Sequence, residues 1–286
     1  MNLLLIVSIV VAVVKSSVYN RFAKKANPDL NGIFGFNMVS YGIAALAALL
    51  SGLGTDVSLA TIVCALFYGV IVCSLQGLSV YAMKIGPMST TSLVVLYGMV
   101  IPMIAGPIFW KEPLSVLQLV GTVMIIVSIW LINKKEADSR PAEKKWIWII
   151  IILFFLSGFA GLMEKIHQST SGRDEKSMFL FSAYLIMFVI SLFGKLLTRK
   201  NGTKGNQKTT ALYGSISGII IFGYALVNLT LAGNLDSMIY YPVSNGGAFI
   251  LTVLVSVAVF GEKCTKKQVF GFVTGLLSVL LLSLPV

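Results

Sequence analysis

Long stretches without any Asp, Glu, Lys or Arg divide this sequence, and they constrain its fold more than any other feature. Nine of them are at least as long as the roughly 17 residues that a short transmembrane helix needs: 30–55, 57–83, 85–110, 113–133, 146–163, 177–194, 209–235, 237–261 and 268–286. A tenth candidate begins at the N-terminus, where residues 2–14 are uncharged and the apolar pattern resumes after Lys15. Continuous Leu, Ile and Val runs without strict alternation favour helices over a closed barrel, the other structure that can span lipid. The sequence therefore predicts an all-α integral membrane protein with ten transmembrane helices.

The composition excludes several other classes of protein. Only 12% of the residues are charged and 57% are hydrophobic, whereas a soluble domain carries about 25% charged residues. Disordered chains are poor in apolar side chains, so disorder is excluded as well. No HExxH or GxSxG motif is present, and the three cysteines form no CxxC pair, so we expect neither an enzyme nor a bound metal or cofactor.

The net charge of +11 is distributed unevenly between the two sets of loops. Numbered along the chain, the odd loops hold 17 Lys and Arg residues and the even loops hold four, with Lys15 inside a span. The positive-inside rule then places the odd loops in the cytoplasm and both termini outside. We interpret the basic excess as a topology signal with contact to anionic lipid, and we expect no nucleic acid partner.

The chain repeats itself at a distance of 150 residues. Residues 109–121 align with 259–271, so that Glu112 matches Glu262, and Ser128 later matches Ser278. Two five-helix repeats are predicted, 1–133 and 146–286, joined by a charged cytoplasmic linker, 134–145. Because five is odd, the second repeat must cross the membrane in the opposite sense. Inverted repeats are typical of secondary transporters, in which the substrate site lies between the repeats.

These residues resemble a known family. Ten helices in two repeats, with Phe-Trp-Lys-Glu at 109–112 and Phe-Gly-Glu at 260–262 before the last helix of each repeat, look like the EamA-like branch of the drug/metabolite transporter superfamily. The resemblance implies a bundle with a central cavity lined by the first, third, fourth, sixth, eighth and ninth helices. It also implies a peripheral fifth and tenth helix, often at a dimer contact, so that a monomer or a homodimer is expected.

Lys15 is the one charge well inside a predicted span. Its ammonium could face the cavity and attract a carboxylate or phosphate of the substrate. Alternatively, the flexible side chain could snorkel towards the cytoplasmic interface. Ser8, Ala12 and Tyr19 share its helix face, a mildly polar stripe suited to a cavity.

All eleven acidic residues are expected at span ends or in loops. Glu164, near the end of the sixth span, is interpreted as a boundary charge or as a possible gate. Helix directions place it near the external surface and Lys15 nearer the cytoplasm, so no direct pair is expected, and His167 is expected in a loop. Without an embedded carboxylate, proton-coupled export of cationic drugs is disfavoured.

Other polar side chains inside the spans are candidates for substrate binding. They could bond the ligand or only a neighbouring helix. Pro242, with Gly246 and Gly247, predicts a break in the ninth helix that could expose backbone groups to the substrate. Together with Lys15, the candidates are Tyr19, Ser74, Gln76, Tyr97, Tyr224, Asn228, Tyr240, Tyr241 and Asn245.

The sequence therefore predicts a secondary transporter in a bacterial plasma membrane. It would move a small polar metabolite, an amino acid or a similar compound, outward by alternating access. The alternatives are a carrier of nucleotide-linked or lipid-linked sugars and a multidrug exporter.

Overall fold

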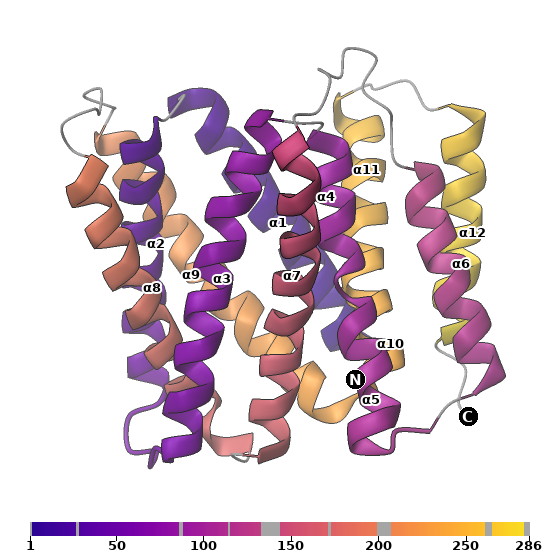
Figure 1. Cartoon of the computed structure of the whole chain (residues 1–286), viewed down its shortest axis with the longest axis horizontal. Coiled ribbons are helices and arrows are strands. Elements are labelled where there is room, and N and C mark those ends of the chain that lie inside the picture. Colours follow the sequence, from indigo (N-terminus) through magenta and orange to yellow (C-terminus); the bar gives the residue numbers. More distant parts are fainter. Residues whose placement is uncertain are drawn as a thin grey trace. The chain divides into compact units, whose positions relative to one another are not determined.

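The computed structural model describes residues 2–26, 29–85, 88–113, 115–132, 144–170, 173–198, 207–260 and 265–282. Every regular element within these ranges is helical (Figure 1), which confirms the all-α prediction. The predicted linker lies outside the described residues except for Lys144 and Lys145, and Glu262 and Cys264 also lie outside them.

Five helices are long and apolar enough to cross a membrane: Leu30–Ser51, Leu59–Ser79, Lys145–Thr170, Lys176–Thr198 and Gln207–Asn234. Four shorter apolar segments accompany them: Leu3–Tyr19, Val94–Trp110, Val116–Leu131 and Val269–Leu282. These segments lie at the positions of the charge-free windows, and the windows at 85–110 and 237–261 are each divided between several elements.

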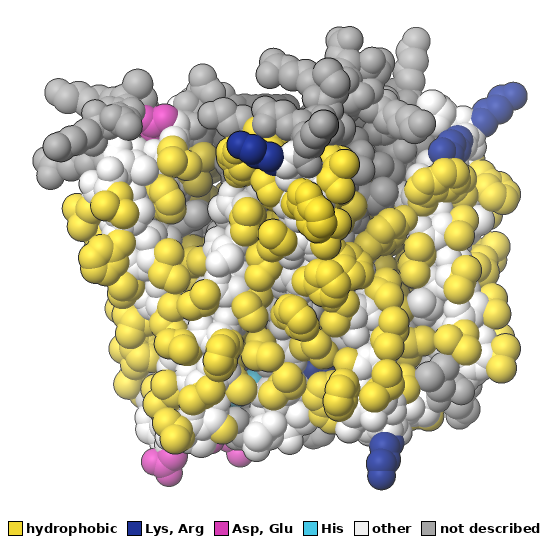
Figure 2. Space-filling model, in the orientation of Figure 1, with side chains coloured by type: hydrophobic (Ala, Val, Ile, Leu, Met, Phe, Trp, Pro, Cys, Tyr) yellow, Lys and Arg dark blue, Asp and Glu magenta, His cyan; other side chains and the backbone are white. Residues whose placement is uncertain are grey.

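Large hydrophobic side chains are exposed along these helices, and Leu197, Leu59 and Phe109 are among the most exposed, at 83%, 76% and 75%. On the face drawn in Figure 2, hydrophobic side chains cover most of the helix length, and most visible Lys, Arg, Asp and Glu side chains lie near helix ends. A soluble protein rarely exposes such continuous apolar surface. The distribution is the one that a lipid environment requires.

The chain forms two compact units. Unit 1 consists of Met1–Val10, Ser74–Leu162 and Asn234–Val286, and unit 2 consists of Val11–Cys73 and Met163–Gly233. Four helices contribute residues to both units: α1 (Asn2–Ala26), α3 (Leu59–Ile85), α7 (Lys144–Thr170) and, by its last residue alone, α9 (Gln207–Asn234). Each unit thus contains segments from both predicted repeats.

Unit 2 also contains α2 (Leu30–Ser51), η1 (Arg173–Glu175), α8 (Lys176–Thr198) and most of α9 (Gln207–Asn234). The side chain of Asp29 caps α2 by accepting from the Gly32 N–H at 2.7 Å. The α2 and α8 helices pack along each other in antiparallel directions. Ser51 donates to Ser177 at one end, and Asn31 donates to the Lys195 carbonyl at the other.

Unit 1 contains α4 (Met88–Tyr97), α5 (Val100–Trp110), α6 (Val116–Ile132), α10 (Ser237–Tyr241), η3 (Pro242–Gly246), α11 (Gly247–Phe260) and α12 (Lys266–Leu282). The α6 and α12 helices pack closely and are antiparallel. Ser128 of α6 donates to the Gly271 carbonyl of α12 at 2.6 Å. In return, Ser278 of α12 donates to the Gly121 carbonyl of α6 at 2.7 Å.

Two spans of unit 1 are irregular. A turn at Gly98–Met99 separates α4 from α5, and the π-helical segment η3 joins α10 to α11. The expected break at Pro242 therefore takes the form of a π-helical turn, because a proline without an N–H widens the local hydrogen-bond pattern instead of ending the helix. The interruption at Gly98 was not predicted.

Glu112 caps the start of a helix far along the chain. Its Oε2 accepts from the Ser237 N–H at 2.7 Å and its Oε1 accepts from the Ser237 hydroxyl at 3.2 Å, at the start of α10. Lys111 precedes it with φ of 53°, the left-handed conformation that turns the chain after α5. Gly106 leaves room for the carboxylate, because a Cβ there would collide with Glu112.

Candidate functional site

The predicted site residues are divided between the two units. Unit 2 holds Lys15, Tyr19, Glu164, Tyr224 and Asn228. Unit 1 holds Ser74, Gln76, Tyr97, Tyr240, Tyr241 and Asn245.

In unit 2 the Lys15 ammonium lies over the ring of Tyr224, with Nζ 3.9 Å from the ring centroid. This is a cation–π contact, which gains strength where water is excluded. The Tyr224 hydroxyl is hydrogen-bonded to the side chain of Asn228, which lies one turn further along α9 and is buried. Both Lys15 and Tyr224 are half-buried. The ammonium is therefore held on an aromatic face inside unit 2.

Glu164 lies inside α7, and this corrects its interpretation as a boundary charge. The helix continues beyond Glu164 to Thr170. The Tyr68 hydroxyl of α3 donates to Glu164 Oε1 at 3.0 Å. Glu164 and Lys15 also interact electrostatically, which the depth argument from sequence did not anticipate, because that argument ended the helix too early.

We call Lys15, Tyr68, Glu164, Tyr224 and Asn228 the charged cluster. Its members come from α1, α3, α7 and α9, so four helices of unit 2 converge on it. Tyr184 of α8 is buried and interacts electrostatically with Glu164, while its hydroxyl bonds the Ile221 carbonyl at 3.3 Å. Tyr19 packs edge-on against Phe36, with ring centroids 5.3 Å apart.

Sequence reasoning missed Tyr68 and Tyr184. A tyrosine in an apolar window resembles an ordinary packing residue until its hydroxyl partner is known. The one available signal was that a carboxylate inside a span requires donors from other helices.

His167 was expected in a loop, but it is a fully buried residue of α7. Its Nε2 lies 3.1 Å from the Thr61 hydroxyl, and its Nδ1 lies 3.0 Å from Nε2 of Gln168. Thr61 donates its hydroxyl proton to Glu175, so the network assigns the ring proton of His167 to Nε2 and an accepting role to Nδ1.

Glu175, in η1, ends this network. Its carboxylate also accepts from the Ser58 N–H and hydroxyl, at 2.9 and 2.8 Å. The hydrogen bonds from Thr61 and Ser58 hold the pKa of the Glu175 carboxyl below its usual value, because they stabilise its charged form. His167 stacks on Phe179 with centroids 4.1 Å apart, and Phe179 also contacts Tyr68 at 5.3 Å. Through Phe179, the network thus packs against Tyr68 of the charged cluster.

In unit 1, two predicted site residues have hydroxyl groups that are bonded within the fold. Tyr97 donates to the Ile126 carbonyl at 3.1 Å, and Tyr241 donates to the Gly161 carbonyl at 2.7 Å. Tyr240 is buried beside Tyr241, with centroids 4.6 Å apart. These three side chains contribute to the packing around the start of η3.

The other predicted residues of unit 1 are half-buried: Ser74, Gln76 and Asn245. Asn245 lies in η3, where the backbone leaves the regular α-helical pattern. Its neighbour Ser244 is buried and shares a hydrogen bond of 3.0 Å with Ser8 of α1. Unit 1 therefore offers hydroxyl and amide groups beside an irregular backbone.

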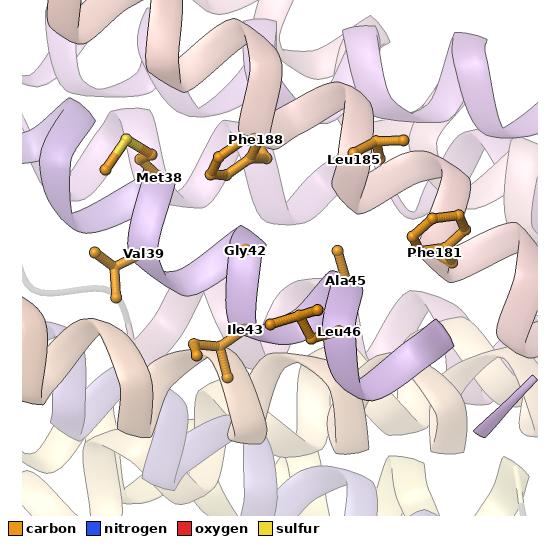
Figure 3. A pocket seen from close by; sticks show the side chains of 9 residues that line it. All are labelled: Met38, Val39, Gly42, Ile43, Ala45, Leu46, Phe181, Leu185 and Phe188. Carbon is orange, nitrogen blue, oxygen red and sulfur yellow. The ribbon is translucent and has the colours of Figure 1, made fainter. Parts of the chain in front are cut away.

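An apolar pocket of about 450 Å³ lies on unit 2 between α2 and α8 (Figure 3). It is lined by Met38, Val39, Gly42, Ile43, Ala45, Leu46, Phe181, Leu185 and Phe188. These side chains provide no charge or hydrogen-bonding group for a polar ligand, so we do not place the candidate site there. Within the described residues, no group of three His, Cys, Asp or Glu side chains could hold a metal ion.

Apolar helices with a lipid-compatible surface define a multi-pass integral membrane protein. Residues 3–134 match the model of the EamA-like transporter family, within the drug/metabolite transporter superfamily. The resemblance stated from sequence is confirmed over this region. Over these residues the chain is therefore similar to a family of membrane transporters.

A solved structure titled "Crystal structure of protein" is similar over 98% of this chain and 95% of its own, with a TM-score of 0.75 and 12% identity. At that identity the likeness concerns the fold alone. None of the curated proteins matches the chain.

Proposed function

We propose that the protein is a secondary transporter that exports an amino acid, or a similar small polar metabolite, by alternating access. The observation that carries this proposal is the charged cluster, in which a cation and a carboxylate lie within segments that are otherwise apolar. Ionisable groups at such positions are costly to maintain and usually serve a solute or ion pathway.

Packing between the matching helices supports an inverted ten-helix repeat. The sequence repeat pairs Ser128 with Ser278 and Gly121 with Gly271, and these residues form the reciprocal hydrogen bonds between α6 and α12. Equivalent helices that pack antiparallel are expected when the two repeats cross the membrane in opposite directions. The family match at residues 3–134 nearly coincides with the first predicted repeat.

The chemistry of the cluster favours a zwitterion. In the proposed binding mode, the substrate carboxylate approaches the Lys15 ammonium and the substrate ammonium approaches Glu164 and the Tyr68 hydroxyl. Both substrate charges then find partners in a site of low polarity, which compensates their loss of water.

The orientation of the chain in the membrane and its location in the cell are proposed from the charge pattern of the loops. The basic odd loops face the cytoplasm and both termini face outward in a bacterial plasma membrane, where the transporter acts as a monomer or homodimer. Closure of one side of the binding site while the other opens would carry the substrate across.

A multidrug exporter is the second candidate, because Glu164 provides the embedded carboxylate that the sequence analysis lacked. An organic cation could bind Glu164 and the tyrosines of the cluster. Such a substrate would not need Lys15. A nucleotide-linked sugar is less favoured, because Glu164 would repel its diphosphate.

Transport by purified protein in proteoliposomes tests the proposal. The probe is a mixture of isotopically labelled protein amino acids, exchanged against the same unlabelled mixture inside the vesicles. Lys15→Ala should abolish exchange. Lys267→Ala is the matched control, because Nζ of Lys267 lies 4.1 Å over the Trp130 ring, a similar contact outside the cluster.

Unchanged exchange by Lys15→Ala would remove Lys15 from the site. Exchange of organic cations but no amino acid would favour the multidrug exporter. A thermal-shift screen of the same amino acids gives an independent measurement, because a ligand that binds only the folded state raises the apparent stability.

A further inference from the structure

The apolar pocket between α2 and α8 opens on the surface of unit 2, and we call it the α2–α8 groove. Its volume of about 450 Å³ lies within the range of cavities that hold small ligands. Leu46 and Leu185 line the groove, although they are 57% and 44% exposed. In a protein that crosses a membrane, exposed apolar side chains in the middle of a span contact lipid, so the groove is accessible to the hydrocarbon chains of the bilayer.

The apolar wall that α8 contributes to the groove ends at a cation. This wall consists of Phe181, Leu185 and Phe188 (Figure 3), which share one helix face because they are spaced four and three residues apart. Seven residues beyond Phe188 the same face carries Lys195, in the last turn of α8. The face thus combines an apolar stripe with a positive charge at one end.

The Lys195 side chain lies across the neighbouring helix. A Cβ placed on Gly35 of α2 would be 3.6 Å from Lys195 Cε and 3.7 Å from its Nζ, so the ammonium lies close to the α2 backbone. Gly35 precedes Gly42 of the groove by seven residues and belongs to the same face of α2. The Asn31 amide secures this end by donating to the Lys195 carbonyl and the Thr198 hydroxyl, at 2.8 and 3.1 Å. The ammonium is therefore held between the two helices that form the groove.

Other cations of unit 2 lie at the same end as Lys195. Arg21 and Lys25, near the end of α1, and Lys208, near the start of α9, are exposed. Asp29 also lies here, where its carboxylate caps α2. Basic groups between membrane-spanning helices attract the headgroups of anionic lipids.

The spacing between the charge and the groove matches the dimensions of a phospholipid. At 1.5 Å per residue, the α8 wall begins about 10 Å from Lys195, at Phe188, and ends about 21 Å from it, at Phe181. One leaflet of hydrocarbon is about 15 Å deep, half of the bilayer core. An acyl chain whose headgroup lies at Lys195 therefore reaches the groove with its middle and terminal carbons.

A second copy of the chain fits the groove less well. The groove extends along α2 from Met38 to Leu46, a length of about 12 Å, which is roughly the diameter of one helix. A stable interface between two proteins buries about 800 Å² on each partner, over a much longer contact. The charge at the end of the groove also favours an anionic occupant.

We propose that the α2–α8 groove and Lys195 form a binding site for one anionic phospholipid, with the phosphate at the ammonium and an acyl chain in the groove. The lipid braces α2 against α8 between the hydrogen bonds that join the ends of these helices. The site shares no residue with the charged cluster, so the inference does not depend on the substrate that is transported.

Native mass spectrometry of the delipidated protein in detergent tests the site, because it counts bound lipids during a titration. The probes are dioleoyl phosphatidylglycerol, dioleoyl phosphatidylcholine, which has the same chains without net charge, and glycerol phosphate, which has no chains. Wild type should bind its first phosphatidylglycerol about fivefold more tightly than phosphatidylcholine, the effect of one lysine near a headgroup. Equal affinities for the two lipids, or glycerol phosphate bound as tightly as phosphatidylglycerol, would overturn the proposal.

Removing the charge tests the headgroup contact. Lys195→Gln should abolish the preference for phosphatidylglycerol over phosphatidylcholine. Lys266→Gln is the matched control, because Lys266 is an exposed cation at the first residue of α12 in unit 1. A preference that survives in Lys195→Gln, or that is lost equally in Lys266→Gln, would contradict the role of Lys195.

Filling the groove tests the acyl-chain contact. Leu185→Trp should weaken both lipids about tenfold, the effect of displacing about two methylene groups, and should leave their ratio unchanged. Leu212→Trp is the control, because Leu212 of α9 is 58% exposed and lies outside the groove. Leu46→Trp fills the groove from the α2 wall and replaces Leu185→Trp if that variant does not fold.

The groove variants also test the competing occupant. Lipid affinity unchanged in the folded groove variants would overturn the proposal. Loss of a dimer at unchanged lipid affinity would overturn it as well, because the groove would then contact a second copy of the chain.

Discussion

The two units place polar groups in an apolar environment by different means. Unit 2 contains opposite charges, Lys15 and Glu164, held by aromatic and hydroxyl groups from several helices. Unit 1 contains interrupted helices, with the turn at Gly98–Met99 and the π-helical segment η3, and the bond between Ser8 and Ser244 beside η3 is between neutral groups. Charge recognition is thus concentrated in unit 2 and backbone irregularity in unit 1.

This difference predicts the kind of substitution to which each unit is sensitive. A charge in an apolar region is tolerated only while its electrostatic partners remain, so unit 2 should be sensitive to single charge removals. An irregular helix depends on close packing and on particular hydrogen bonds, so unit 1 should be sensitive to added volume and to lost acceptors.

The largest effect is expected from removing one member of the charge pair. Lys15→Met leaves Glu164 without its counter-charge, and Glu164→Gln leaves Lys15 without its own. Each should destabilise the protein by about 2.5–3.5 kcal/mol, the cost of a lone charge within a span. The double variant should lose less than the sum. Thermal unfolding in one detergent measures all four proteins, and additive losses would show that the two residues are independent.

The next largest loss of stability is expected in unit 1, from adding a methyl group at Gly98. A Cβ there would lie 2.6 Å from the Ser157 Cβ and 2.8 Å from the Phe154 carbonyl oxygen of α7. Gly98→Ala should therefore cost about 1–3 kcal/mol through overpacking. Gly77→Ala in α3 is the control, because nothing lies within 4 Å of its added Cβ, and it should be neutral or stabilising. Equal effects at both positions would contradict the packing argument.

A smaller loss is expected where Glu112 caps α10. Glu112→Ala removes the acceptor for the Ser237 N–H and hydroxyl and should cost about 1 kcal/mol. Glu112→Gln keeps one acceptor oxygen and should lose less. Thermal unfolding orders the variants, and a loss for Glu112→Gln equal to that of Glu112→Ala would contradict a cap based on hydrogen bonding.

Two tyrosines then sharpen the contrast between the units. Tyr241→Phe removes a bond to the Gly161 carbonyl and should cost about 1 kcal/mol while leaving amino acid exchange unchanged. Tyr68→Phe in unit 2 removes the hydroxyl that donates to Glu164 and should weaken amino acid exchange. Exchange lost in Tyr241→Phe, at unchanged stability, would place Tyr241 at the substrate.

Much of the fold could be predicted from charge-free windows, because lipid imposes one simple demand on a spanning segment. Lys15 could be selected for the same reason, as a charge inside such a window. Gly98–Met99 could not be predicted as an interruption, because the residues that exclude a side chain there, Phe154 and Ser157, are distant in sequence.

The position of Glu164 was misjudged for a related reason. The polar residues that follow it were interpreted as the end of the span. His167 is buried because Thr61 and Gln168 satisfy both ring nitrogens, and the identity of Thr61 as a partner is a property of the packed helices. Tyr68 was missed because a hydroxyl acquires a role only through a partner from another segment.

The smallest effect is expected from the network that supports the charged cluster. The pKa of Glu175 is held below its usual value by Thr61 and Ser58. A carboxyl whose pKa is lower in the folded state stabilises the protein above its unfolded pKa, and this contribution is lost as the pH falls through the folded value. Wild type should therefore unfold at a higher temperature than Glu175→Gln near neutral pH.

The difference should diminish as the pH falls below about 4, where the carboxyl takes up a proton. Paired thermal unfolding of the two proteins across this range measures it, with Asp56→Asn as an exposed acid in the same part of unit 2. A difference that persists at low pH would mean that Glu175 contributes by packing and not by its charge. In that case the network would support Phe179 and Tyr68 by shape alone, and unit 2 would depend on charge only at Lys15 and Glu164.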